Sequence, residues 1–176
     1  MPGSGKGTCV EYFTGKNLPS VYFGGMVYEE IEKRGLDRIA DEKKVRLDMR
    51  QKEGLDVLAK RASQKAEDLI TKGAQTIIFD GLYSWTEYKY LSEKFGDSLV
   101  VVAVVSNRKL RHQRILARKD GRNYTQELII EREVSEIEDL EKGGPIAFAD
   151  FYIINNGDIN SLTIQLDDLS KKLGLS

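Results

Sequence analysis

The sequence has very few of the residues that build disulfide frameworks and metal clusters. It contains one cysteine, Cys9, and one histidine, His112. A single cysteine excludes an internal disulfide and a multi-cysteine zinc site, and it fits a reducing, cytoplasmic environment. A single histidine argues against a histidine-based metal centre or a Ser-His-Asp triad. Because His112 lies among arginines and a glutamine, we interpret it as a solvated helix residue.

Long apolar runs and a strong charge of either sign are also lacking. No stretch approaches membrane-spanning length, and no signal peptide is recognisable at the start. The net charge of −1 provides no basic field of the kind that attracts nucleic acid. We therefore expect neither a membrane nor nucleic acid as the main partner. Apolar residues make up 40% of the 176 residues, which is enough for one core in a single domain over residues 1–176.

Short apolar runs alternate with longer helical stretches along the chain. This alternation predicts a three-layer α/β/α fold with a parallel sheet covered by helices. Each expected strand is followed by a helix, and the strands are at residues 21–23, 76–80, 99–105 and 151–154. The run at 99–105 is the most apolar and predicts a strand buried on both faces. Helices are expected over about 6–16, 24–34, 41–52, 55–72, 85–95, 108–119, 124–142 and a closing segment in which Leu162, Leu166, Leu169 and Leu173 recur at helical spacing.

The chain opens with a glycine-rich segment typical of a phosphate-binding loop. Glycines let backbone N–H groups converge on phosphate oxygens, and the following helix adds its positive N-terminal end. Lys6 adds a full charge for the outer phosphates. The residues expected to bind ATP are Gly3, Ser4, Gly5, Lys6, Gly7 and Thr8. A glycine-rich turn that happens to begin a helix is the alternative, which the near-complete motif disfavours.

Two features of this loop depart from the general pattern. The Ser/Thr position directly after the lysine holds Gly7, and Thr8 follows one residue later, so Mg²⁺ ligation by Thr8 is less direct. The motif also requires a glycine and an apolar strand before Met1. We expect that the first central strand has been lost from this chain by truncation, with a naturally shortened N-terminus as the alternative.

The loop resembles that of nucleoside monophosphate kinases, Gly-x-Pro-Gly-x-Gly-Lys-Gly-Thr. Residues 79–84, the arginine-rich segment from Arg108 and residues 149–157 resemble dephospho-CoA kinases and a group of adenylate-kinase-like proteins. The resemblance implies a kinase that uses ATP and Mg²⁺ to phosphorylate a nucleotide-like small molecule. It also implies acceptor-site helices over about 24–72, a short lid over about 114–130 and a nucleotide contact at Asn155.

Asp80 ends an apolar strand and is followed by Gly81. A carboxylate at this position of a phosphate-loop enzyme orients Mg²⁺ or its bound water, whereas the alternative is an aspartate that caps the next turn. By resemblance, the Asp80–Gly81 pair lies next to the acceptor pocket. Tyr83 occupies a position where similar proteins often have arginine. Gly81 and Tyr83 are therefore implied acceptor contacts, and the identity of the acceptor stays open.

Arginines at positions 111, 114, 118 and 122 are spaced by three or four residues. They share one helical face if the helix continues that far. By resemblance, Arg114 and Arg118 are implied as lid residues that close over the phosphates, and a solvated charged face is the alternative. Arg50, followed by Gly54, resembles an Arg-x-x-x-Gly element of the group and is implied in holding an acceptor phosphate.

Three functions remain open from the sequence. The first is a small-molecule kinase with Lys6, Asp80, Arg114 and Arg118 at its catalytic centre. The second is an ATP-binding regulatory module without kinase activity, which Tyr83 and the missing glycine favour. The third is a kinase of nucleic-acid ends, which the near-neutral charge disfavours.

Overall fold

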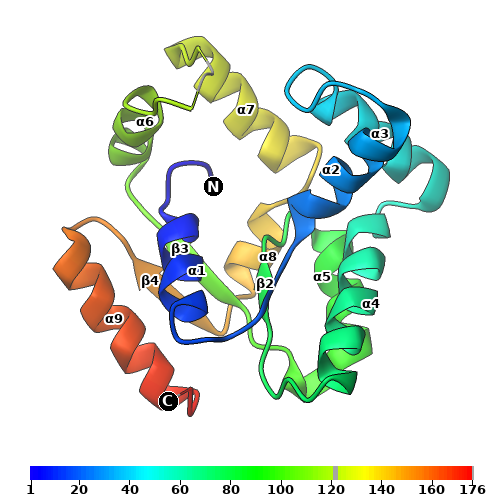
Figure 1. Cartoon of the computed structure of the whole chain (residues 1–176). Helices are drawn as coiled ribbons and strands as arrows, with labels where there is room; N and C mark the ends of the chain where they lie inside the picture. The colour runs from blue at the N-terminus through cyan, green and yellow to red at the C-terminus, as the bar shows by residue number, and fades with distance from the viewer. Residues whose placement is uncertain (121–122, 176) are drawn as a thin grey trace. The chain divides into compact units, whose positions relative to one another are not determined.

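The computed structural model describes residues 1–120 and 123–175. The chain forms two compact units, unit 1 from Met1–Lys16 with Val100–Ser176 and unit 2 from Asn17–Leu99. Each unit contains a two-stranded parallel sheet and helices that follow its strands (Figure 1). This arrangement confirms the α/β class with parallel strands. No helix in the described part of the chain is both long and apolar enough to cross a membrane.

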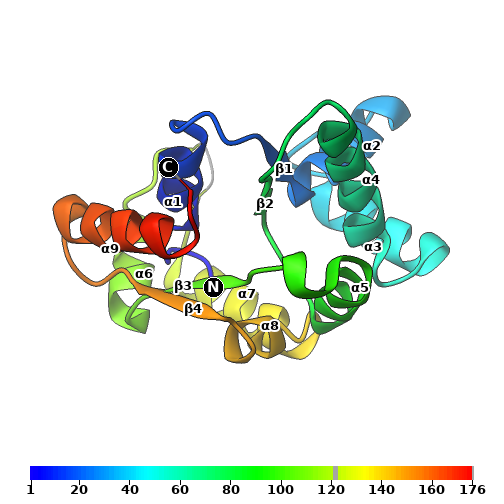
Figure 2. The same ribbon diagram turned by 90° about the horizontal axis from the view of Figure 1, so that it is seen from below.

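Unit 1 is built around β3 (Val102–Val105) and β4 (Phe151–Ile154). The strands pair in parallel, with Val102 opposite Phe151 and Val105 opposite Ile154. Figure 2 shows α1 and α9 on the same side of this sheet. The helices of unit 1 are α1 (Lys6–Thr14), α6 (Arg108–Leu116), α7 (Gln126–Glu138), α8 (Gly143–Ala147) and α9 (Ile159–Lys172).

The closing helix α9 packs its leucine face against β4. The helix begins at Asp158, whose side chain accepts a hydrogen bond of 2.9 Å from the Ser161 amide. The buried apolar side chains along it are Leu162, Leu166 and Leu169, which confirms three positions of the predicted face. The fourth, Leu173, lies just beyond the end of the helix and is half-buried. The prediction that the third strand is buried on both faces is wrong, because only Ala103 of β3 is buried. In the described residues β3 pairs only with β4. Each strand is therefore an edge strand, with one side that no other strand covers.

Unit 2 contains β1 (Ser20–Tyr22) and β2 (Ile78–Asp80), which pair in parallel with Tyr22 opposite Asp80. Its core lies among the helices, where α4 packs against α2 and α5. Ala59, Ala62 and Ala66 of α4 are buried, and their small side chains allow this close approach. The helices of unit 2 are α2 (Phe23–Arg34), α3 (Glu42–Glu53), α4 (Val57–Thr71), α5 (Trp85–Phe95) and the short η1 (Gly96–Ser98).

The first strand is shorter than predicted, because the chain turns into α2 directly after Tyr22. Phe23, expected to end the strand, is the first residue of the helix and is fully buried. A Cβ on Gly24 would lie 2.3 Å from the Tyr22 hydroxyl. The glycine therefore lets the first turn of α2 fold back over the tyrosine ring.

Two helices of unit 1 also end earlier than predicted. α6 ends at Leu116 rather than near residue 119, and α7 ends at Glu138. The chain then passes through Glu141, whose φ of 51° lies in the left-handed region and cannot continue a helix. A separate short helix, α8, follows.

Candidate nucleotide-binding site

The glycine-rich loop turns sharply before it enters α1. Gly3 and Gly5 have φ values of 77° and 96°, in the left-handed region that side chains disfavour. Packing imposes the same restriction. A Cβ on Gly3 would lie 2.5 Å from the Arg111 carbonyl oxygen, and one on Gly5 would lie 2.1 Å from Nδ2 of Asn155. Both glycines are therefore required by the backbone path that leads into the helix.

The first turn of α1 contains Lys6, Gly7 and Thr8. The N–H groups of a first helical turn have no acceptor within the helix, and the helix dipole makes this end positive. Lys6 and Thr8 are half-buried and Gly7 is exposed. No atom lies within 4 Å of the place where a Cβ on Gly7 would be. This end of α1 has the geometry of an anion site for nucleotide phosphates.

The side chain of Asn155 supports the loop from the end of β4. It is 7% exposed, and its Nδ2 donates a hydrogen bond of 2.8 Å to the Ser4 carbonyl oxygen. The Asn155 carbonyl oxygen in turn accepts hydrogen bonds from Ser106 Oγ at 2.7 Å and Arg114 Nη1 at 3.0 Å. The structure thus places Asn155 against the loop backbone and connects Arg114 to the carboxyl end of β4.

The two arginines expected in a lid lie in different surroundings. Arg114 belongs to α6 and is half-buried. Arg118 is exposed and lies beyond the end of α6, so it does not extend the helical face that carries Arg111 and Arg114. Arg122, which was considered for the same face, lies outside the described residues.

A buried carboxylate of α7, Glu133, collects three side chains from α6. Arg111 Nη1 donates to Glu133 Oε1. Oε2 accepts from Arg108 Nε at 2.8 Å and lies 3.0 Å from His112 Nε2. Burial raises the pKa of Glu133, but hydrogen bonds from these three side chains outweigh that effect and hold the pKa at about 2. Glu133 is therefore a fixed anion behind the loop.

His112 is 7% exposed, so its interpretation as a solvated residue is wrong. Its Nδ1 lies 2.6 Å from Gln126 Nε2, an arrangement in which Nδ1 accepts and Nε2 donates to Glu133. The partners stand 14 and 21 positions away in the sequence. The residues around His112 carry no local signal for this burial.

A second buried carboxylate of α7, Glu136, pairs with two cations. Its oxygens lie 2.6 Å from Lys142 Nζ and 3.2 Å from Arg132 Nε. Burial lowers the pKa of Lys142, and the ion pair with Glu136 opposes that shift. The positive charges of Arg132 and Lys6 lower the Lys142 pKa further.

In unit 2, the predicted acidic residue lies at the carboxyl edge of the sheet. Asp80 ends β2 opposite Tyr22. Burial raises the pKa of Tyr22 to about 12, and neighbouring Tyr28 and Asp80 shift it in the same direction. Gly81 follows with a φ of 107°, and a Cβ there would lie 2.8 Å from the Tyr83 ring. Ligands of open α/β sheets bind at this edge.

Arg50 is connected to the same region of unit 2 through Glu87. Arg50 is 8% exposed and Glu87 is fully buried, with Arg50 Nη1 at 3.4 Å from Glu87 Oε1. Glu87 Oε2 also accepts a hydrogen bond of 2.9 Å from the Tyr83 amide. The structure therefore brings the predicted acceptor residues Arg50 and Tyr83 together on one carboxylate.

Sequence reasoning did not identify Glu87, although part of its role has a local signal. Ser84 Oγ accepts a hydrogen bond of 3.1 Å from the Glu87 amide, and Ser-x-x-Glu is the pattern of a capping box at a helix start. Its ion pair with Arg50 spans 37 positions and has no such signal.

Replacing Glu87 with alanine is expected to lower the free energy of unfolding by about 3 kcal/mol, because it leaves the Arg50 guanidinium buried without its counter-ion. Urea denaturation measures this loss. Glu67→Ala is the matched control, since Glu67 forms an ion pair with Lys94 but is 43% exposed and is expected to lose about 1 kcal/mol or less. Equal losses in the two variants would contradict this assignment.

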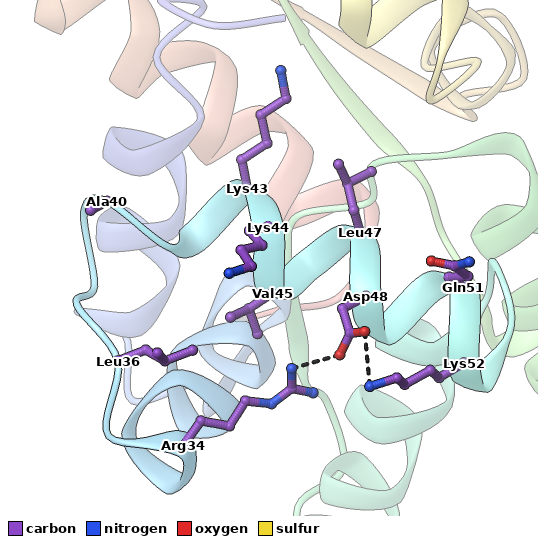
Figure 3. A pocket seen from close by; sticks show the side chains of 10 residues that line it. All are labelled: Arg34, Leu36, Ala40, Lys43, Lys44, Val45, Leu47, Asp48, Gln51 and Lys52. Carbon is purple, nitrogen blue, oxygen red and sulfur yellow. Dashed lines mark hydrogen bonds and ion pairs between the residues drawn. The ribbon is translucent and has the colours of Figure 1, made fainter.

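A hollow with a volume of about 730 Å³ lies beside α3 in unit 2 (Figure 3). Asp48 at its wall pairs with Arg34 at 2.6 Å and Lys52 at 2.9 Å. The lining residues are Arg34, Leu36, Ala40, Lys43, Lys44, Val45, Leu47, Asp48, Gln51 and Lys52. None of the predicted site residues is among them.

The predicted Mg²⁺ ligands belong to different units, Thr8 to unit 1 and Asp80 to unit 2. Within residues 1–120 and 123–175, no group of three or more His, Cys, Asp and Glu side chains is placed to hold a metal ion. Mg²⁺ is commonly held by one or two carboxylates together with substrate phosphates.

The glycine-rich loop, the helix that follows it and the parallel strands define the P-loop NTPase class. A model of the AAA domain family matches residues 1–131. The crystal structure of TT1252 from Thermus thermophilus has the same fold, with a TM-score of 0.66 and 18% sequence identity. That match covers 98% of this chain and 93% of the other.

Close relatives identify the family within this class. UPF0200 protein TK1334 from Thermococcus kodakarensis is 37% identical over 162 residues, which cover 89% of this chain and 85% of the relative. A UPF0200 protein from Thermococcus gammatolerans is 35% identical over 178 residues, covering 98% and 92% respectively. The chain therefore belongs to the UPF0200 family of P-loop proteins.

Proposed function

We propose that this protein is an ATP-dependent phosphotransferase that moves the γ-phosphate to a nucleotide or a nucleotide-like small molecule. The observation that carries the proposal is the loop before α1, where Gly3 and Gly5 adopt left-handed φ values and Lys6 opens the helix. The resemblance of this loop to nucleoside monophosphate kinases, and of residues 149–157 to dephospho-CoA kinases, supports the choice of acceptor class. A cytoplasmic location belongs to the same proposal.

The loop fits the phosphates of ATP. The Gly3 and Gly5 positions have no room for side chains, so the backbone itself lines the loop. The open space at Gly7 leaves the first turn of α1 accessible to a phosphate group. Thr8 and Asp80 are the residues proposed to hold Mg²⁺ or its bound water, and the ion would supply positive charge against the phosphates.

The proposed mechanism relies on positioning and charge neutralisation rather than on covalent catalysis. Lys6 holds the transferring phosphate. Arg114 and Arg118 neutralise charge that develops on the phosphoryl oxygens. Arg114 is already oriented, because Ser106 Oγ at 3.2 Å and the Asn155 carbonyl oxygen at 3.0 Å accept hydrogen bonds from its Nη1.

The acceptor is proposed to bind at the carboxyl edge of the β1–β2 sheet, where Gly81 and Tyr83 follow Asp80. The ring of Tyr83 folds against Gly81. Arg50 contributes through Glu87, which joins it to the Tyr83 amide. An aromatic ring and a guanidinium are suited to a nucleotide-like molecule with a base and an anionic group.

The proposal is tested by incubating the protein with ATP and Mg²⁺ and a panel of nucleosides, nucleotides and dephospho-CoA. We expect one class of nucleotide-like acceptor to be phosphorylated. ATP bound tightly without phosphorylation of any acceptor would instead favour an ATP-binding regulatory module. Tyr83, which occupies a position where similar proteins often have arginine, is the feature that favours this second function.

Asp80→Asn is expected to reduce Mg²⁺-dependent phosphate transfer by about a hundredfold, because the amide removes the charge that orients the metal. Steady-state assays at saturating ATP measure this loss. Asp97→Asn is the control, since Asp97 is exposed in η1 and no role in metal binding is proposed for it. Full activity of Asp80→Asn would remove Asp80 from the catalytic centre.

A further inference from the structure

We infer that Glu133 is a positioning residue for the phosphate loop and that it acts through Arg111, an inference that rests on the proposed nucleotide binding. Arg111 Nη1 donates a hydrogen bond of 3.2 Å to the Pro2 carbonyl oxygen and a second one to Glu133 Oε1. Its Nε donates at 3.2 Å to the Ser106 carbonyl oxygen. The guanidinium therefore joins the loop, the end of β3 and α7.

The backbone of Arg111 contacts the loop independently of its side chain. Its carbonyl oxygen lies 2.5 Å from the place where a Cβ on Gly3 would be. Gly3 and Arg111 are thus in backbone contact, and a displacement of this part of α6 would move the loop. The first turn of the phosphate loop is therefore held by both the side chain and the main chain of one α6 residue.

Glu133 fixes the orientation of that residue. The side chains of Arg111 and Glu133 are 9% and 5% exposed, so both charges are largely removed from water. A buried guanidinium needs a carboxylate and well-directed hydrogen bonds to remain in place. With Glu133 present, the Arg111 donors are directed to protein acceptors. Arg111 thus shapes the loop that holds phosphate, whereas Arg114 and Arg118 are the arginines proposed to contact it.

Arg108 supplies a matched control for Glu133. It donates to Glu133 Oε2 at 2.8 Å, but its side chain is 60% exposed. Arg108→Gln removes one partner of the carboxylate and leaves the hydrogen bonds of Arg111 to Pro2 and Ser106 in place. If Glu133→Gln acts only by weakening the contact between α6 and α7, Arg108→Gln will show the same effect. If Glu133→Gln acts by releasing Arg111 from the loop, Arg108→Gln will behave like the wild type.

The first experiment uses the nucleotide-free protein. Hydrogen–deuterium exchange of the peptide covering residues 1–9 is expected to be about tenfold faster in Glu133→Gln than in the wild type. The loop opens more often, and exposes its amides, when Arg111 holds the Pro2 carbonyl oxygen less firmly. Arg111→Lys, which keeps the charge but loses the fork-shaped donor group, is expected to give the same increase. Arg108→Gln is expected to exchange like the wild type.

The second experiment compares ligands with and without phosphates. Glu133→Gln is expected to weaken binding of ATP and ADP about tenfold, in line with the loss of a charge-assisted hydrogen bond. Binding of adenosine, which has no phosphate for the loop to hold, is expected to stay unchanged. A purely structural role would change all three affinities equally, or would change only the melting temperature.

The outcomes separate this inference from the proposed function. A wild-type protein that binds neither ATP nor ADP overturns the proposed function, and the exchange experiment still decides whether Glu133 holds the loop. The inference is overturned if residues 1–9 of Glu133→Gln exchange at the wild-type rate. It is also overturned if Arg108→Gln accelerates their exchange as much as Glu133→Gln does. Unchanged ATP binding by Glu133→Gln overturns it as well.

Discussion

Lys6→Ala is expected to reduce ATP-dependent phosphate transfer by about three orders of magnitude while the fold stays intact. Lys6 is the first residue of α1, where its charge adds to the positive end of the helix dipole. Phosphoryl transfer develops charge on the outer phosphate oxygens, and preorganised cations lower the barrier most where that charge grows. Turnover assays with the acceptor found in the panel measure the loss.

Thermal unfolding of Lys6→Ala without nucleotide shows whether the fold is retained, since the substitution places a good helix former in the first turn. Lys109→Ala is the control, because Lys109 is an exposed lysine of α6 and no role in phosphate binding is proposed for it. Retained turnover in Lys6→Ala would refute the assignment of the loop as a catalytic phosphate site.

Much of the fold could be predicted because the deciding signals are local. The bounds of β4 and α5 agree with the predicted segments 151–154 and 85–95, where an apolar run and a serine before a helix give clear edges. The helix α2 begins one residue before the predicted start, because Gly24 permits contact with the Tyr22 ring. The end of α6 was misplaced because charged residues with good helix propensity follow it.

The turn of the glycine-rich loop could be predicted from the sequence, whereas the hydrogen bonds that support the loop could not. Glycine spacing before Lys6 follows from backbone chemistry that any phosphate loop shares. The supports of the loop depend on pairs remote in the sequence, such as Asn155 with Ser4 across 151 positions. Glu133 and Arg111 form a similar pair, across 22 positions. From the sequence alone, charged residues along a helix are more often interpreted as a solvated face. Burial, which only the fold reveals, separates these two cases.

Gly5→Ala is expected to lower the free energy of unfolding by about 3 kcal/mol, whereas Gly7→Ala is expected to raise it by up to about 1 kcal/mol. Both substitutions add one methyl group. Gly5 has a φ of 96° and its Cβ would meet Asn155 Nδ2 at 2.1 Å, so the methyl meets both strain and a clash. Gly7 is a helical residue with open space around it, so alanine there only improves helix propensity.

A double-mutant cycle separates the clash from the backbone strain at Gly5. Asn155→Ala alone loses the hydrogen bond to the Ser4 carbonyl oxygen, yet it also removes the amide that the new methyl would meet. The double variant Gly5→Ala/Asn155→Ala is therefore expected to be more stable than the sum of the single losses, by about 1 kcal/mol or more. Denaturant titrations of the four proteins give this coupling. Strict additivity would mean that left-handed strain alone requires glycine at this position and that Asn155 does not shape the loop.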